Sequence, residues 1–288
     1  MTETISPAAA IIESLEELPP FPPVLAEILQ ILHDKDASAD DLARLIEKDQ
    51  ALTAKLLRLT NSAYYGFSKR IGNITTAVVL LGFNAVKQLV LGVSFLDYFR
   101  RKKSPVLSAA ELWRHSYTSA LCARAISIKT KSDNFETDFV IALVHDVGKL
   151  IISWHFGQRV PKEMDLVRSG GVQGLMEERR VFGADHAELG AELARAWQFP
   201  DVLVDVIRLH ETPFLSQVTD QKYLQQLLVV HLADQIAWPH QLSTGARLSQ
   251  APFIDSVVEK LGVSQGDLIR IAADSATRSA TVLEALGE

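Results

Sequence analysis

The chain has 288 residues, of which 48% are hydrophobic, so it can bury the core of one large or two ordinary domains. Its formal net charge of −6 argues against sequence-independent binding to nucleic acid. No apolar run reaches the roughly 18 to 20 residues that cross a membrane, and the acidic start is unlike a signal peptide. The single cysteine, Cys122, excludes an intrachain disulfide and suits a reducing compartment. We therefore expect a cytoplasmic protein that does not associate with membranes.

The hydrophobic periodicity is helical in almost every segment, and no segment alternates as a strand does, so the sequence predicts an all-α fold. The proline-rich segment at residues 19–23 is expected to be extended and to lead into a helix from near Val24. Ser38 lies three residues before Asp41, which predicts a capping box at the start of the next helix. The first hundred residues therefore begin with at least two helices.

The next helices are predicted from their N-terminal caps. Asp49 is expected to cap a helix over residues 51–61, and a short helix is expected over residues 75–81. Asn84 is expected to follow a turn and to cap the long helix after it. Because short turns join these helices, we predict a helical bundle over residues 1–103.

The composition changes between Arg101 and Ser108, which marks a domain boundary. Ser108 is expected to cap a helix that ends near Lys131, and a second helix is expected from Asn134 through a His-Asp doublet. Further helices are predicted over residues 185–197, from Pro200, and over residues 223–238 and 264–286. We predict a second helical subdomain over residues 104–240 and C-terminal helices, packed on the bundle, over residues 241–288.

The doublet lies in a strongly apolar stretch, residues 142–152, which holds His145, Asp146 and Lys149. Transfer of an ionisable group from water into an apolar core costs on the order of several kcal/mol, unless another group pairs with it. A divalent cation is a good partner for an imidazole beside a carboxylate. The alternative is a buried polar pair that hydrogen-bonds to neighbouring helices.

Other ionisable side chains fall on predicted helices in positions where they can converge with the doublet. They are Glu111 and His115, four residues apart on one helix face, His186, His210, Glu211, and Asp234 in an apolar helix. Helix-borne histidines and carboxylates that meet in a bundle core form sites for one or two metals. Nitrogen and oxygen ligands without a thiolate favour iron, manganese, nickel or zinc.

Several of these residues also have structural interpretations. Glu111 complements a helix dipole, and His186 can be a capping-region residue. Asp234 has no such explanation inside so apolar a helix. Four other histidines match no pattern and are interpreted as structural; they are His33, His155, His231 and His240.

The order His115, His145-Asp146, Asp234 resembles the HD superfamily of metal-dependent phosphohydrolases. More closely, the chain resembles the HDOD signalling domains of bacteria over residues 18–240. The matching motifs are Leu18–Pro22, Leu57–Ala63, Ala77–Gly82, and Gly183–Ala191 followed by Trp197–Pro200. Many HDOD domains lack the His-Asp doublet, which this chain retains together with Lys149.

The resemblance extends to the HD-GYP phosphodiesterases, and it implies a ligand set. Its members are Glu111, His115, His145, Asp146, His186, His210 and Asp234. The Gly-Tyr-Pro signature is missing, and His210-Glu211 stands where two histidines are expected, which puts a two-metal site in doubt. Glu211 can still bind a hard cation.

Two functions follow as hypotheses. The first is a signalling module with a metal-binding HD pocket, which acts through partner proteins or by sensing a ligand. The second is a metal-dependent phosphohydrolase that acts on a nucleotide or cyclic dinucleotide through metal-activated water, with Asp146 and Lys149 as catalytic residues. Nucleic-acid binding by the N-terminal bundle is disfavoured, because its basic residues do not reverse the net charge.

Overall fold

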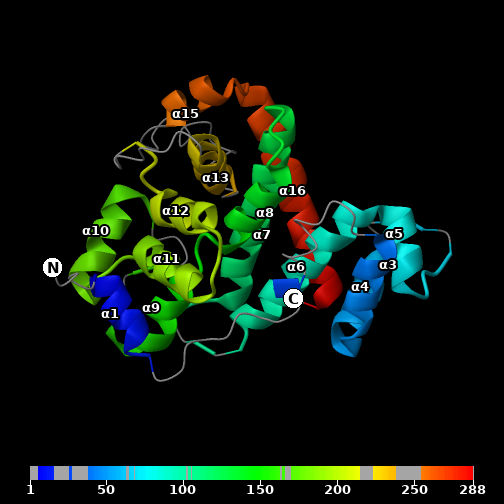
Figure 1. Cartoon of the computed structure of the whole chain (residues 1–288), viewed down its shortest axis with the longest axis horizontal. Helices are drawn as coiled ribbons and strands as arrows, with labels where there is room; N and C mark the ends of the chain where they lie inside the picture. The colour runs from blue at the N-terminus through cyan, green and yellow to red at the C-terminus, as the bar shows by residue number, and fades with distance from the viewer. Residues whose placement is uncertain are drawn as a thin grey trace. The chain divides into compact units, whose positions relative to one another are not determined.

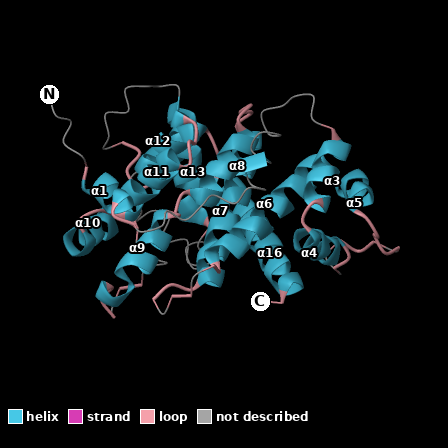
Figure 2. Cartoon of the chain, turned by 60° about the horizontal axis from the view of Figure 1, so that its bottom comes forward, coloured by secondary structure: helices cyan, strands magenta, loops and turns pink. Residues whose placement is uncertain are grey.

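The structure is a computed structural model in which only part of the chain is described. The described residues are 6–15, 26–27, 38–62, 65–67, 69–101, 103–104, 106–162, 164–165, 170–214, 223–237 and 254–287. Within these ranges every regular element is a helix and no strand occurs (Figure 2). The predicted all-α fold is therefore confirmed. The proline-rich entry and most of the helix expected from Val24 lie outside the described residues.

The backbone divides into two compact units. Unit 1 comprises Met1–Pro19 and Lys102–Thr277, and unit 2 comprises Pro20–Arg101 and Arg278–Glu288. The division after Arg101 coincides with the change of composition in the sequence. Of the described residues near the C-terminus, 254–277 group with unit 1, beyond the predicted subdomain end at residue 240, and those from Arg278 on group with unit 2.

Unit 2 is a small bundle in which α3 (Ala39–Glu47), α4 (Gln50–Thr60) and α5 (Ile74–Leu81) each start at a side-chain cap. These helices and α6 (Phe83–Phe99) pack on one another (Figure 1). Ser38 and Asp41 form the predicted capping box, and Asp49 accepts a hydrogen bond from the backbone N–H of Leu52 at 3.0 Å. Asn73 caps α5 in the same way.

The junction between α5 and α6 differs from the prediction. Gly82 alone separates the two helices, with φ 89° and ψ 151°, a conformation that a residue with a side chain rarely adopts. Asn84 therefore lies inside α6 and does not cap it; its side-chain oxygen accepts a hydrogen bond from Lys87 Nζ at 3.2 Å. A single glycine thus replaces the predicted turn.

Unit 1 is built around α7 (Ala109–Lys129), which packs against α8 (Phe135–Val144) and α13 (Leu224–Ile236). A second group of helices, α9 (Gly148–Phe156), α11 (His186–Ala196) and α12 (Asp201–Leu209), packs together beside α8 and α13. The remaining elements of unit 1 are α1 (Pro7–Glu13), the short 3-10 helix η1 (Gly157–Arg159), α10 (Gly171–Phe182), α15 (Ile254–Leu261) and the part of α16 (Gln265–Leu286) up to Thr277.

The stretch from Phe135 to Arg159 is long and apolar enough to cross a membrane by length and composition alone. Of its most apolar 18-residue window, however, 89% is buried inside the protein. Its hydrophobicity is accounted for by its place in the core of unit 1.

The sequence predicted that the His-Asp doublet lies within a helix, but in the structure it lies in a turn between two helices. His145, Asp146 and Val147 form a tight turn between α8 and α9, and Lys149 belongs to α9. The turn is closed by hydrogen bonds over three residues, from Val147 N–H to Val144 O and from Lys149 N–H to Asp146 O, each 3.0 Å long. The apolar residues on either side of the turn form α8 and α9, and the turn between them directs the side chains of His145 and Asp146 into the core.

The turn is followed by a close approach of α9 to α11. A Cβ atom on Gly148 would lie 1.9 Å from the backbone oxygen of His186 and 2.7 Å from the backbone nitrogen of Gly190. Only glycine allows the two backbones to meet here, and this contact sets the distance between Asp146 and His186.

We expect Gly148→Ala to lower the free energy of unfolding by about 3 kcal/mol, because the new methyl group would overlap the α11 backbone. The matched control is Gly157→Ala, at a helical position where the nearest atom, Val106 Cγ2, lies at 4.0 Å. Urea denaturation of both variants checks this. Equal stability of the two would contradict the close contact.

Candidate metal centre

A cluster of ionisable side chains lies in the core of unit 1, and each of them is at most 6% exposed. We call it the His–Asp cluster. Its members are His115 from α7, His145 and Asp146 from the turn, Lys149 from α9, His186 from the start of α11, His210 and Glu211 after α12, and Asp234 from α13. Residues separated by more than a hundred positions therefore meet at one buried point.

Asp146 is at the centre of the cluster. Its Oδ2 lies 3.5 Å from His115 Nε2, 3.4 Å from His145 Nε2 and 2.9 Å from Lys149 Nζ. Its Oδ1 lies 3.4 Å from His186 Nε2. The two oxygens of one carboxylate thus face two different groups of histidines.

These groups form two overlapping sets of potential metal ligands. In the first set, His115, His145 and Asp146, the ligand atoms all lie within 4.8 Å of one another. The second set, Asp146, His186 and His210, meets the same condition. Asp234 Oδ1 completes the first set, at 2.9 Å from His115 Nε2 and 3.5 Å from His145 Nε2. Asp146 is shared, so it is placed to bridge two cations.

The histidine rings are held with the same nitrogen facing the cluster. His145 Nδ1 donates to the carbonyl of Ala142 and His210 Nδ1 to that of Ile207, both at 2.7 Å. A carbonyl oxygen only accepts, so Nδ1 carries the proton and Nε2 of the neutral ring keeps its lone pair. This arrangement of a ligand nitrogen and a supporting acceptor is typical of metal-binding histidines.

His186 is held by a carboxylate instead. Glu178 Oε2 accepts hydrogen bonds from His186 Nδ1 at 2.7 Å and from the His186 backbone N–H at 2.8 Å. Nε2 of His145, His186 and His210 makes no hydrogen bond with the described residues, although all three atoms are buried. Buried polar atoms are normally satisfied. A cation among these nitrogens would satisfy them, so the donor set fits a divalent metal.

The carboxylates of the cluster and Glu178 raise the pKa values of two of its histidines. Burial lowers the pKa of His145, but Asp146 and Asp234 outweigh this effect and raise the pKa to about 10. Burial likewise lowers the pKa of His186, and Glu178 outweighs it, so this pKa rises to about 8. Without a cation these two rings therefore hold a second proton, on Nε2, at neutral pH, and a cation must displace it.

In His210 and Glu211, burial outweighs the nearby opposite charges, so the pKa shifts favour the neutral form of each side chain. Burial and the neighbouring rings of His145 and His186 lower the pKa of His210 to about 3. Burial and the nearby Asp234 raise the pKa of Glu211 to about 7. A histidine binds a metal as the neutral imidazole, so His210 needs to lose no proton. A carboxylate binds in its ionised form, and a nearby cation would stabilise that form of Glu211.

Glu211 stands at the edge of the second set. Its Oε1 lies 3.8 Å from His186 Nε2 and 4.0 Å from His210 Nε2, and the carboxylate accepts a hydrogen bond from the Gly171 backbone. Its Oε2 makes no hydrogen bond with any described residue. The structure therefore brings Glu211 to the cluster, in the place where the sequence lacks a second histidine.

Glu111, in contrast, lies outside the cluster. Its side chain is exposed in the first turn of α7, and its backbone N–H donates to Ser108 Oγ at 3.3 Å. This is the helix-dipole position that the sequence offered as its structural interpretation. Among the predicted ligands, all but Glu111 are gathered at one point, and their role in metal binding stays a prediction.

Sequence reasoning missed two supporting residues. Glu178 is fully buried, although it stands beside Arg179 and Arg180 in a strongly polar segment that looks solvent-exposed. His231, which was interpreted as structural, donates from Nδ1 to the backbone oxygen of His210 at 2.6 Å. Its spacing of three residues from Asp234 places both on one face of α13, which was the available signal.

The model of the HDOD domain family matches residues 18–213 of this chain. The chain belongs to the HDOD domain family. This match includes both the helices of unit 2 and the His-Asp doublet of unit 1. The resemblance found in the sequence is confirmed.

Curated relatives and solved structures agree with this assignment. An uncharacterized protein of Treponema pallidum is 27% identical over 210 residues, which are 73% of this chain and 40% of that protein. The protein YuxH of Bacillus subtilis, also uncharacterized, is 30% identical over 104 residues, 36% of this chain and 25% of its own length. The chain thus spans less than half the length of these relatives.

Among solved structures, an HDOD domain protein of unknown function from Geobacter sulfurreducens has a TM-score of 0.76 and 26% identity, and the match covers 98% of this chain and 96% of that one. A Shewanella amazonensis protein, provisionally named a phosphohydrolase, has a TM-score of 0.70 and 23% identity over 96% and 98% of the two chains. A Marinobacter aquaeolei protein, provisionally named a signal transduction protein, has a TM-score of 0.73 and 18% identity over 98% and 64%. At these identities the last two show the fold alone.

We expect Glu178→Gln to weaken Mn²⁺ or Zn²⁺ binding about 10- to 100-fold, because the amide removes the charge behind His186 while keeping an acceptor for Nδ1. Isothermal titration calorimetry measures the affinity. Asp138→Asn is the matched control: Asp138 is also fully buried and accepts a hydrogen bond from Ser127 at 2.6 Å, but it is no member of the cluster. Equal losses in both variants would contradict a specific effect of Glu178.

We expect metal affinity to rise between pH 6 and pH 8. The raised pKa values of His145 and His186 mean that protons compete with the cation, and this competition weakens as the pH rises. Calorimetry in two buffers of different ionisation enthalpy should show protons released on binding. A constant affinity without proton release would contradict this charge balance.

Proposed function

We propose that this chain is a cytoplasmic bacterial signalling module whose His–Asp cluster binds one or two divalent transition metals for structure or sensing. Its output is contact with partner signalling proteins through helical surfaces, or the sensing of a small ligand. The proposal extends the family assignment and the geometry of the cluster.

The observation that carries the metal site is the shared orientation of the histidine rings. Each of these three histidines, His145, His186 and His210, has an acceptor behind Nδ1 and a buried Nε2 without a hydrogen bond to the described part of the chain. These Nε2 atoms face the carboxylates of Asp146, Asp234 or Glu211. A cation placed among them would satisfy these nitrogens and the carboxylates together. Iron, manganese, nickel and zinc suit this donor set.

The signalling role is supported by the extent of the family match. Residues 18–213 include all the helices of unit 2 from α3 to α6, and none of these supplies a member of the His–Asp cluster. A hydrolase that used only the cluster would not need them. We assign them to contacts with partners.

The alternative is a metal-dependent phosphohydrolase or phosphodiesterase, with a nucleotide or cyclic dinucleotide as its substrate. A bound cation supplies Lewis-acid polarisation of the phosphoryl oxygens and activates water. In that function Asp146 holds the cations, and Lys149, at 2.9 Å from Asp146 and buried beside it, stabilises negative charge that develops on the substrate.

Elemental analysis of protein purified without chelator, combined with assays on bis(p-nitrophenyl) phosphate and a cyclic dinucleotide, distinguishes the two functions. We expect bound iron, manganese, nickel or zinc that is lost in His145→Ala, and no turnover at ordinary enzyme rates. Turnover that His145→Ala abolishes would replace the signalling module by the hydrolase. Protein that holds no metal under any condition would contradict both.

A further inference from the structure

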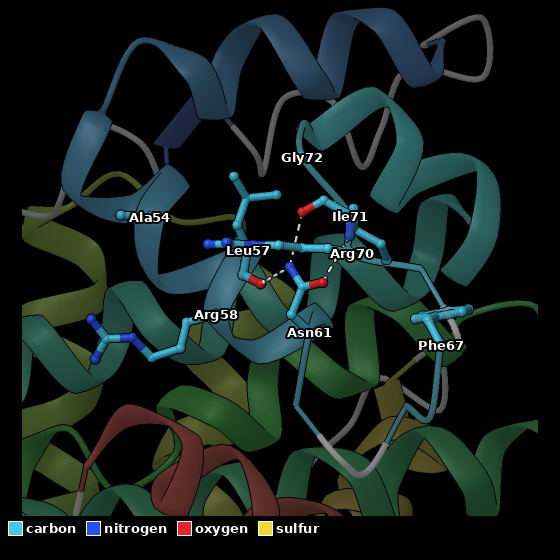
Figure 3. Close-up of a pocket in the computed structure, with 8 residues that line it drawn as sticks. All are labelled: Ala54, Leu57, Arg58, Asn61, Phe67, Arg70, Ile71 and Gly72. Atoms are coloured by element: carbon cyan, nitrogen blue, oxygen red, sulfur yellow. Dashed lines mark hydrogen bonds between the residues drawn. The ribbon is translucent and has the colours of Figure 1, made fainter.

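A second candidate site lies in unit 2, on α4 and the segment that follows it. A cavity of about 960 Å³ is lined by residues that include Leu57, Arg58, Asn61, Phe67 and Arg70 (Figure 3). This volume lies within the range of small-molecule pockets. None of its lining residues belongs to the His–Asp cluster.

The pocket is lined on one side by α4 and on another by residues 70–72, and Asn61 holds these two segments together, so the pocket is preformed. The side-chain amide donates to the carbonyl of Leu57 at 2.7 Å and to that of Ile71 at 2.9 Å, and its oxygen accepts from the Ile71 backbone at 2.8 Å (Figure 3). These bonds tie the last turn of α4 to residues 70–72. Binding of a ligand would therefore cost little conformational entropy in these two segments.

The pocket carries positive charge without a compensating carboxylate. Arg58 and Arg70 line it, no Asp or Glu does, and neither guanidinium has an ion pair with the described residues. Some other cations of unit 2 are paired: Lys48 with Glu27 at 2.9 Å and Lys55 with Asp97. In a chain of net charge −6, two arginines at one pocket without an ion pair among the described residues indicate an anionic ligand.

The close-up shows how these groups are distributed. The side chains of Arg58 and Arg70 extend toward the same side of the pocket, and Phe67 lies on the opposite side of Asn61 (Figure 3). The Phe67 ring stacks on Tyr65, with 6.4 Å between ring centroids and 7° between planes. One end of the pocket is therefore cationic and the other offers a flat aromatic surface.

We propose that this pocket binds a nucleotide, with its phosphate on Arg58 and Arg70 and its base toward Phe67. Guanidinium groups pair with phosphate through two parallel hydrogen bonds, and bases stack on aromatic rings. The pocket is separate from the His–Asp cluster, so the proposal does not rest on the metal. It concerns a small ligand and not a polynucleotide, because the net charge of the chain is −6 and the pocket is lined by only two basic side chains.

The test is equilibrium binding of AMP, GMP, adenosine and inorganic phosphate to the whole chain, followed by calorimetry. We expect at least one of the two nucleotides to bind more tightly than adenosine and phosphate. Arg58→Gln and Arg70→Gln should each weaken binding about tenfold or more, and added salt should weaken binding by the wild type. Phe67→Leu should reduce the advantage of the nucleotide over phosphate.

The matched control is Arg44→Gln, which removes an exposed arginine of the same unit that is paired with Asp41 at 2.6 Å and does not line the pocket. It should bind as the wild type does, and so should His145→Ala, which alters only the cluster. Binding that His145→Ala abolishes and the two pocket variants retain would overturn the proposal. Absence of nucleotide binding, or capture of an acidic peptide in preference to nucleotides, would also overturn it.

Discussion

The structure of unit 1 depends on the placement of one buried carboxylate, that of Asp146. Its two oxygens face separate pairs of histidines, and Lys149 lies against one of them. Burial raises the pKa of Asp146, yet Lys149 and His145 outweigh it and hold the pKa well below its ordinary value. An ionised carboxylate in such a core persists only with positive charge around it. The histidines, a lysine and the proposed cations supply that charge.

The fold places this carboxylate by interrupting a helix. The tight turn at residues 145–147 directs the doublet into the core, and Gly148 lets α9 touch the backbone of α11 at His186. Behind the rings, two carbonyl oxygens and Glu178 fix the orientation of the nitrogens. Local backbone geometry and a second layer of acceptors therefore determine the ligand geometry, and both lie outside the ligand residues themselves.

Much of this arrangement could be predicted from the sequence, because the helical periodicity and the caps at Ser38, Asp49 and Ser108 are local signals. The convergence of His115, Asp146 and Asp234 followed from polar residues in apolar helices and from a resemblance to a family. The break after Val144 could not be predicted, because the apolar pattern continues through it. Glu178 was missed because its partner, His186, lies across a glycine turn and becomes its neighbour only in three dimensions. Asn84 was misplaced because one residue, Gly82, suffices to join two helices.

Unit 2 shows the same relation between local bonds and function. Asn61 lies in a motif that matches the family, and its three hydrogen bonds explain why that position takes an asparagine. Arg58 and Arg70, which have no ion pair with the described residues, are a separate feature, to which we assign the proposed nucleotide. Two sites of different chemistry in two units are consistent with a module that links a buried metal centre to a small ligand or a partner.

The most direct test of the metal centre is a crystal structure of the protein grown with Mn²⁺ or Zn²⁺, with the cations located by anomalous scattering. We predict density between Asp146 and the Nε2 atoms of the surrounding histidines, at roughly 2.0 to 2.2 Å from its ligands. A cluster whose nitrogens are occupied only by protons and water, with the metal elsewhere on the surface, would contradict the proposed centre.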